Sequence, residues 1–230
     1  MLNESHFTKY EYYRQDTKAL NIPLVLKFIF NLQHNFFKPF CLNGSPIHAF
    51  VYRIVTVKKI LTPLHRPDIE GLRICEQVLL SGDILVFRDQ VHRILCEMVE
   101  KGEELPFSLK DEVVYYCGPT PARHGMPVGS AGPTTASRMD MFTEPLLEQG
   151  LAMMIGKGNR SQQIAQSLHK HRAVYMVAIG GTGALIAQHI TASRVIAFPE
   201  LGTEAARIFT VSDMPLIVGI DSNGDNAFYG

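Results

Sequence analysis

Cysteine is scarce in this sequence of 230 residues, and its four cysteines (Cys41, Cys75, Cys96 and Cys117) lie far apart without forming a CxxC pair. This spacing lacks both a metal-ligand signature and the cysteine framework of a disulfide-stabilised domain. We therefore expect buried, reduced thiols in a cytoplasmic protein, with no metal site built by this chain.

An excess of charge of either sign is also missing. Lys and Arg number 22, Asp and Glu also number 22, and the pI is about 7.1. This balance argues against a nucleic-acid or anionic-membrane surface. Hydrophobic residues make up 46% and charged residues 19% of the chain, a composition typical of a folded domain of ordinary size.

No apolar run is long enough to span a membrane. The strongest, residues 24–30, is interrupted by Lys27, and polar residues follow it. No small-residue cleavage site comes after it, and the basic residues before it are mixed with acids, so we expect no signal peptide. The sequence therefore predicts no membrane association.

A complete nucleotide-binding motif is absent too. Residues 178–183 (Ala-Ile-Gly-Gly-Thr-Gly) follow an expected strand and open a helix, and Glu200 comes about twenty residues later. However, Ile186 stands where the third glycine of the dinucleotide motif belongs. Gly156-Lys157 likewise lacks the glycine spacing and the Ser/Thr of a phosphate-binding P-loop. The alternative, implied by the family resemblance described below, is that residues 178–183 pack a helix closely on the sheet.

The most informative segment is residues 129–140, which combine glycines, hydroxyl side chains and one arginine. Glycines such as Gly132 let backbone approach a ligand, and Thr134 and Thr135 provide hydroxyls and free N–H groups where a helix is expected to begin. Arg138 adds a planar fork that can bind a carboxylate through two hydrogen bonds. The alternative is a capped loop with a solvated arginine.

A second segment, residues 81–92, reads as a turn, a buried strand and the start of a helix. It ends with Arg88, Asp89 and His92, and Arg88 and His92 are four residues apart, so they share one helix face. This pattern predicts an active-site rim at a strand end. The alternative is an Arg–Asp surface pair with a histidine satisfied by the backbone.

Strand and helix patterns alternate after residue 51 and favour an α/β layered domain. We expect a helix signal from about residue 134 to residue 150 that kinks or restarts at Pro145. The other expected helices cover residues 89–100 and 184–190. Expected strands cover residues 77–80 and 84–87 (joined by a turn at 81–83), 113–117, 174–179, 195–198, 208–211 and 216–221.

An ordered series of motifs from about Lys58 to Tyr229 resembles the C-terminal domain, or separate beta subunit, of iron–sulfur class I fumarases and L-tartrate dehydratases. The matching residues include Leu61-Thr62-Pro63-Leu64, Leu80-Ser81-Gly82, Arg88-Asp89 with His92, Gly118-Pro119, Gly129 to Thr135 with Arg138-Met139-Asp140, Ile155 to Asn159, Gly180-Gly181, Pro199 to Gly202 with Glu204-Ala205, and Asp221 with Gly224. The resemblance implies a three-layer β/β/α swivelling domain of the class I fumarase C-terminal type.

The resemblance also divides the chain near Phe50. Residues 51–230 are expected to form the fumarase C-terminal-like, beta-subunit catalytic domain. Residues 1–50 are expected to be a divergent, partly disordered N-terminal extension, or alternatively a reading frame started too far upstream.

Site roles come from the same resemblance. It implies that Arg88, Arg138 and Lys157 bind substrate carboxylates, with Thr135 and Gly132 also contacting substrate. Thr134 would be the acid/base, and Asp89 and His92 would assist catalysis by orienting Arg88 and each other. A [4Fe–4S] cluster, held by three cysteines of the alpha portion, would come from an alpha-subunit partner in a heterodimer or heterotetramer.

Three functions stay open at this point. The first is the beta subunit of a fumarate hydratase, which reversibly hydrates fumarate to L-malate in the tricarboxylic acid cycle. The second is the beta subunit of L(+)-tartrate dehydratase or another dicarboxylate hydro-lyase; residues 199–204 favour fumarase weakly over tartrate dehydratase. The third is a non-catalytic domain that binds carboxylates or a protein partner.

Overall fold

A computed structural model describes residues 57–122 and 124–229 of the chain. The expectations for residues 1–50 and for Cys41 lie outside this part. The strands are β1 (Lys58–Leu61), β2 (Gln77–Val86), β3 (Val113–Tyr115), β4 (Met153–Gly156), β5 (Val174–Val177), β6 (Ile190–Ala197) and β7 (Ala206–Ile220). The helices are α3 (Arg66–Glu70), α4 (Asp89–Lys101), α5 (Asp140–Glu148), α6 (Gln162–His171) and α7 (Gly183–Ala187), with 3-10 segments η1 (Ala136–Met139) and η2 (Pro199–Glu204). None of these helices is long and apolar enough to cross a membrane.

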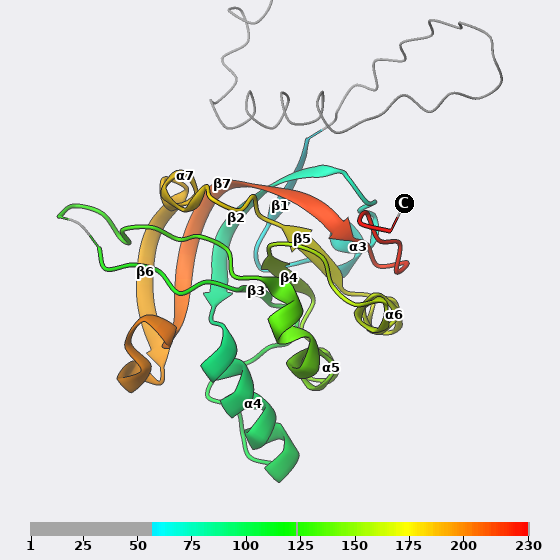
Figure 1. Ribbon diagram of the computed structural model, residues 1–230, viewed down its shortest axis with the longest axis horizontal. Helices are drawn as coiled ribbons and strands as arrows, with labels where there is room; N and C mark the ends of the chain where they lie inside the picture. Colours follow the sequence, from blue (N-terminus) through cyan, green and yellow to red (C-terminus); the bar gives the residue numbers. More distant parts are fainter. Residues whose placement is uncertain (1–56, 123, 230) are drawn as a thin grey trace, which may run out of the picture. The chain divides into compact units, whose positions relative to one another are not determined.

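The strands form one mixed sheet, ordered β1-β2-β3-β4-β5-β7-β6, with an additional β2–β7 pairing. Strands β1 to β5 run parallel to their neighbours, whereas β7 is antiparallel to β2, β5 and β6. Since β7 pairs with both β2 and β5, the pairings β2–β3–β4–β5–β7–β2 close a ring. Figure 1 shows this curved sheet with α4, α5 and α6 gathered on one side.

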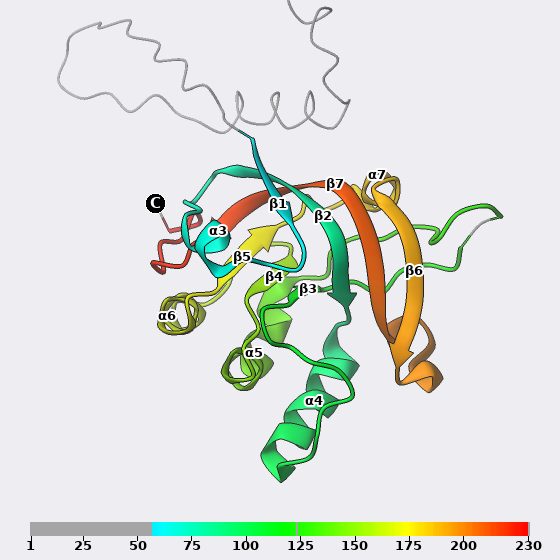
Figure 2. The same cartoon turned by 180° about the vertical axis from the view of Figure 1, so that it is seen from behind.

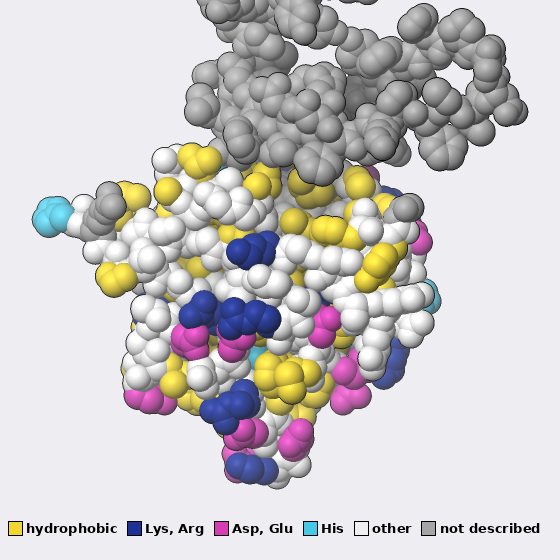
Figure 3. Space-filling model, in the orientation of Figure 1, with side chains coloured by type: hydrophobic (Ala, Val, Ile, Leu, Met, Phe, Trp, Pro, Cys, Tyr) yellow, Lys and Arg dark blue, Asp and Glu magenta, His cyan; other side chains and the backbone are white. Residues whose placement is uncertain are grey.

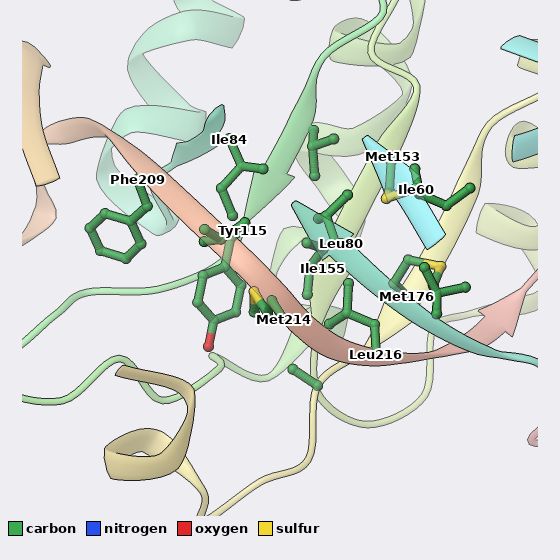
Figure 4. Packing of buried hydrophobic residues seen from close by; sticks show 14 of the residues in the cluster. Ile60, Leu80, Ile84, Tyr115, Met153, Ile155, Met176, Phe209, Met214 and Leu216 are labelled. Carbon is green, nitrogen blue, oxygen red and sulfur yellow. The ribbon is translucent and has the colours of Figure 1, made fainter. Parts of the chain in front are cut away.

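Side-chain alternation along the short central strands produces two separate cores. In β3, Val113 and Tyr115 belong to the first core, whereas Val114 belongs to the second. In β5, Met176 and Tyr175 divide in the same way. Figure 4 shows residues of the first core from β2, β3, β4, β5 and β7 converging between the strands. The second core packs these strands against α4, α5 and α6, which Figure 2 shows from behind. Strands buried on both faces explain the near-continuous apolar runs in the sequence.

The turn expected at residues 81–83 is wrong, because β2 continues through it. β7 pairs along the whole strand, and a register shift between Leu80 and Gly82 takes up the irregularity as a bulge. Gly82 has φ of 110°, and the Thr62 hydroxyl occupies the space where a Cβ would stand. The glycine therefore marks a bulge and a close approach rather than a chain reversal.

Three further sequence expectations are corrected. The two strands expected at 208–211 and 216–221 form the single strand β7, because β2 pairs with both halves of it. Pro145 lies inside α5, and the restart occurs earlier, where η1 meets Asp140. The proline removes one helical hydrogen bond, but burial of Leu146 and Leu147 keeps the helix in place. Finally, Cys96 and Cys117 are buried as expected, whereas Cys75 is exposed.

Candidate active site

The carboxyl ends of the parallel strands β2 to β5 meet at an open pocket of about 420 Å³. Each strand contributes the residues that follow it, a common position for ligand sites in sheets of this kind. The lining consists of Arg88 after β2; Gly118, Ser130, Gly132, Pro133, Thr134, Thr135 and Arg138 between β3 and α5; Lys157 after β4; and Gly181 and Gly183 after β5. Six of the eight sequence-predicted site residues therefore come together here.

The segment before η1 is fixed to the strand ends by backbone hydrogen bonds. The Thr134 N–H donates to the Tyr116 carbonyl (2.7 Å), and the Lys157 N–H donates to the Thr134 carbonyl (3.0 Å). The Ala136 N–H then donates to the Lys157 carbonyl (2.9 Å). Thr134 is buried, while Thr135 is exposed. Thr135 occupies the N-cap position of η1, but its side chain makes no capping hydrogen bond, so this hydroxyl is not used as the expected cap.

Glycines allow the pocket walls to approach each other. A Cβ on Gly183 would stand 2.9 Å from the Gly132 nitrogen, and the Ala131 N–H donates to the Gly183 carbonyl (3.0 Å). The glycine-rich segment 180–183 thus lets the start of α7 pack directly on the loop that carries Thr134. This agrees with its interpretation as a packing element rather than a nucleotide motif.

Two arginines of the pocket are held by carboxylates outside its lining. Arg88 Nη2 lies 2.6 Å from Glu204 Oε1, and Arg138 Nη2 lies 2.6 Å from Asp89 Oδ2. Figure 3 shows basic side chains with acidic ones beside them, in the area where Figure 1 draws the start of α4. Asp89 was expected to orient Arg88, but it pairs with Arg138 instead, and Arg88 pairs with Glu204. Within the described residues, Lys157 forms no ion pair.

His92 is buried behind the pocket and does not line it. Its Nδ1 is hydrogen-bonded to the Arg88 carbonyl (3.0 Å), and its ring packs against Phe87, Tyr116 and Phe142. Burial lowers the pKa of His92 to about 4, so the imidazole is neutral at pH 7. Its hydrogen bond runs to the backbone of Arg88, and among the described residues Nε2 has no partner. Among the described residues, His92 therefore makes no hydrogen bond to Asp89, in contrast to the expectation that these two side chains orient each other.

A buried ionic network under the site was not predicted from the sequence. Arg160 is 1% exposed and binds Asp140 and Thr143 through its guanidinium, which also lies over the rings of Tyr116 and Tyr175. Asp140 additionally accepts a hydrogen bond from the Ser161 N–H (3.0 Å). It therefore joins the start of α5 to the start of α6.

Glu204 and Gly118 also escaped assignment as site residues, although both lie within motifs quoted above. Their importance arises from pairing between distant segments. β2 and β7 are antiparallel with Val86 opposite Arg207, which brings the residues before β7 beside those after β2. A sequence carries this information only when the register is known.

The lining has a clear chemical character. Arg88, Arg138, Lys157 and Thr134 line one open pocket, and no acidic residue is among its lining residues. Guanidinium and ammonium groups bind carboxylates through charge-assisted hydrogen bonds. The arrangement therefore suits a small anionic ligand.

Sequence comparison shows which known proteins this chain resembles. Fumarate hydratase class I, anaerobic, of Escherichia coli is 44% identical over 151 residues, which are 65% of this chain and 28% of that protein. Fumarate hydratase class I, aerobic, of Salmonella typhimurium is 40% identical over 72% of this chain and 30% of its own length. L(+)-tartrate dehydratase subunit beta of Escherichia coli is 30% identical over 74% of this chain and 86% of its own length.

The matched region thus spans less than a third of the fumarate hydratases but most of the tartrate dehydratase subunit. The family model for the fumarase C-terminus matches residues 49–230, which include every strand of the sheet and every residue of the pocket. By this match, the chain belongs to the fumarase C-terminus family.

Proposed function

We propose that this chain is the beta-subunit part of a fumarate hydratase, a hydro-lyase that reversibly hydrates fumarate to L-malate. One observation carries the proposal: Arg88, Arg138, Lys157 and the buried Thr134 line a single pocket. Its membership of the fumarase C-terminus family and its relatives among hydro-lyases support the reaction class.

In this proposal the cations hold a substrate carboxylate while Thr134 exchanges a proton at the reacting carbon. A threonine hydroxyl is a weak base unless neighbouring charge assists it. The hydroxyl of Thr134 makes no hydrogen bond to another described residue, and it lies in a lining rich in positive charge. Thr135 and Gly132 complete the contact surface.

Asp89 and His92 support this chemistry from outside the pocket. Asp89 holds Arg138 through its ion pair, and His92 fixes the backbone of Arg88 at the start of α4. Neither touches the space that the substrate would occupy. We therefore propose orienting roles for both and no direct proton transfer.

The family reaction is expected to use a [4Fe–4S] cluster, which the described cysteines do not fit. No group of three His, Cys, Asp or Glu side chains among residues 57–122 and 124–229 could hold a metal ion. Burial raises the pKa of Cys117 to about 12 and that of Cys96 to about 11, whereas cluster ligands are thiolates. We propose that the cluster is bound by an alpha subunit, and we derive no step through it.

A separate alpha partner is supported by relatives that are themselves subunits. The tartrate dehydratase beta subunit of Escherichia coli and the putative one of Methanocaldococcus jannaschii match this chain over 86% and 88% of their lengths. We propose a heterodimer or heterotetramer in the cytoplasm, with a β/β/α swivelling domain over residues 51–230. The two cores on opposite faces of β3 to β5 support that layered description.

The test is an anaerobic assay of the chain assembled with a cluster-bearing alpha subunit, supplied separately with fumarate, L-malate and L(+)-tartrate. Hydration of fumarate with little activity on tartrate supports the proposal. A preference for tartrate instead assigns the chain to the beta subunit of an L(+)-tartrate dehydratase. Absence of turnover with all three substrates, despite a stable complex, leaves the non-catalytic binding domain.

A further inference from the structure

Glu204 lies outside the pocket, yet it contacts the guanidinium of one of the pocket arginines. We propose that Glu204 is a positioning residue that fixes Arg88 for carboxylate binding, with Gly118 forming the opposite side of the same clamp. The inference rests on the proposed function, because it assigns a role within the same site.

The first support is the geometry around the Arg88 side chain. Its Nη2 lies 2.6 Å from Glu204 Oε1, and a Cβ placed on Gly118 would stand 2.9 Å from Nε and 3.0 Å from Cζ. The Nε atom is buried without a hydrogen-bond partner among the described residues. The guanidinium is therefore confined between the Gly118 backbone and the Glu204 carboxylate, which leaves few orientations for its remaining N–H groups.

The second support is that packing and hydrogen bonds hold the segment that carries Glu204 (residues 201–207, called the platform below) in place. Glu204 ends η2, and a single residue, Ala205, which is 2% exposed, separates it from β7. Arg207 Nη2 donates to the Gly202 carbonyl (2.9 Å), and Leu201 packs on the second core. Because the β2–β7 register places this platform beside the end of β2, Glu204 can hold Arg88 without entering the pocket.

The third support is electrostatic. Glu204 and Arg88 are both mostly buried, with side chains 22% and 29% exposed, so solvent screens this pair less than a surface pair. An arginine side chain has considerable rotamer freedom, and holding it in the binding orientation beforehand reduces the cost of binding. The Glu204 carboxylate also weakens the electrostatic attraction of Arg88 for an anion. Glu204 can therefore favour substrate binding only by orienting the Arg88 guanidinium.

The principal experiment replaces Glu204 by Gln, which keeps size and removes charge, in the chain assembled with its alpha subunit. We expect kcat/KM for fumarate to fall about 10-fold, mainly through a higher KM. Glu204→Asp should retain most of the efficiency, and Gly118→Ala should reproduce the loss by pushing Arg88 from the other side. Glu200→Gln is the matched control, since Glu200 is an exposed residue of η2 with no ion pair among the described residues.

A second readout requires no turnover. The Arg88 Nε–Hε signal of the chain alone, assigned by its loss in Arg88→Lys, is recorded by NMR with and without fumarate. We expect slow hydrogen exchange in the unaltered chain and in Glu200→Gln, fast exchange in Glu204→Gln, and weaker fumarate binding in Glu204→Gln.

The outcomes separate the two proposals. Unchanged Arg88 exchange in Glu204→Gln, or faster exchange with unchanged kinetics and binding, overturns the positioning role. An assembled enzyme that prefers L(+)-tartrate, or that is inactive on fumarate, L-malate and L(+)-tartrate, overturns the proposed function. In either case the positioning role stands only if Glu204→Gln both speeds Arg88 exchange and weakens fumarate binding to the chain, and it falls otherwise.

Discussion

Arg138 and Thr134 line the same pocket. Arg138 supplies a charge and Thr134 a hydroxyl, so each role is tested by a different substitution. Replacing Arg138 by Lys keeps the positive charge but removes the planar fork. If Arg138 binds substrate through two hydrogen bonds, kcat/KM should fall by about 2–4 kcal/mol, roughly 30- to 1000-fold. Steady-state kinetics of the assembled enzyme measure this. Arg93→Lys, on the exposed face of α4, is the control, and an equal effect of the two changes would remove the specific role of Arg138.

Thr134→Val removes the hydroxyl at nearly constant volume. An interaction made mainly in the transition state affects kcat more than KM, so turnover should fall far more than apparent affinity. Thr134→Ser keeps a hydroxyl and should recover part of the rate. Turnover of Thr134→Val equal to that of the unaltered enzyme would exclude the acid/base role.

His92 gives the site a pH dependence that concerns stability. The pKa of His92 is about 4 in the folded chain, whereas the ordinary pKa of histidine, which applies in the unfolded chain, is 6.5. The unfolded state therefore binds a proton more readily. The free energy of unfolding is therefore highest above pH 6.5 and decreases by up to about 3 kcal/mol as the pH falls toward 4. Denaturant unfolding should show about 2 kcal/mol of this loss between pH 7 and pH 5, and the loss should be smaller in His92→Gln. His65→Gln, at an exposed histidine, is the control; an equal pH response in His92→Gln would contradict the assignment.

Residue chemistry could be predicted here better than residue pairing. The types needed for carboxylate binding stand out in the segments that contain Arg88 and Arg138. Their partners do not: Asp89 follows Arg88 in the sequence, yet it pairs with Arg138 while Arg88 pairs with Glu204. Which carboxylate pairs with which arginine depends on the distant segments that the fold places beside each side chain.

At the scale of elements, the buried Arg160 lies between β4 and α6 and binds Asp140 and Thr143 of α5. Its side chain is 0% exposed and its partner Asp140 only 20% exposed, so removing the carboxylate leaves a buried charge without its counterion. Asp140→Asn should therefore lower the free energy of unfolding by about 3 kcal/mol. Chemical denaturation of the chain measures this change.

The matched control is Glu97→Gln, which breaks the exposed pair of Arg93 and Glu97 within α4. These side chains are 54% and 46% exposed, and such pairs contribute roughly 0.5 kcal/mol or less. A loss in Asp140→Asn no larger than in this control would show that the network contributes little to stability.

The location of most elements followed from their apolar patterns, but their ends did not. Helix α4 agrees with its expected range within one residue because its stripe is clear and Gly102 ends it in the left-handed conformation. Strands β2 and β7 were each divided at polar residues, since alternation cannot reveal that two long strands pair across a bulge. Local pattern specifies an element, whereas its length is decided by its neighbours.

At the scale of the whole molecule, the closed ring could not be derived from periodicity, because it depends on β7 pairing with both β2 and β5. The layered α/β class could be. The boundary near Phe50 stays a prediction, since residues 1–56 lie outside the described part.

Deleting residues 1–50 tests that boundary. The recognised motifs begin near Lys58, where β1 starts, and the family match begins at residue 49. We expect the shortened chain to remain soluble, with a melting temperature lowered by no more than about 3 °C and unchanged partner binding. Thermal unfolding and co-purification measure this, and a large drop in melting temperature would place the segment within the core.

The last prediction concerns the distribution of one active site over two chains. Three described cysteines lie apart, two of them with pKa values raised by burial, so this chain alone offers no cluster ligands within its described part. The purified chain should be colourless and inactive, because carboxylate binding without a group to activate the hydroxyl does not complete the hydration. Adding a cluster-loaded alpha subunit under anaerobic conditions should restore turnover. Iron and sulfide analysis of the chain alone is the direct check: stoichiometric iron and labile sulfide on it would overturn the assignment of the cluster to the partner.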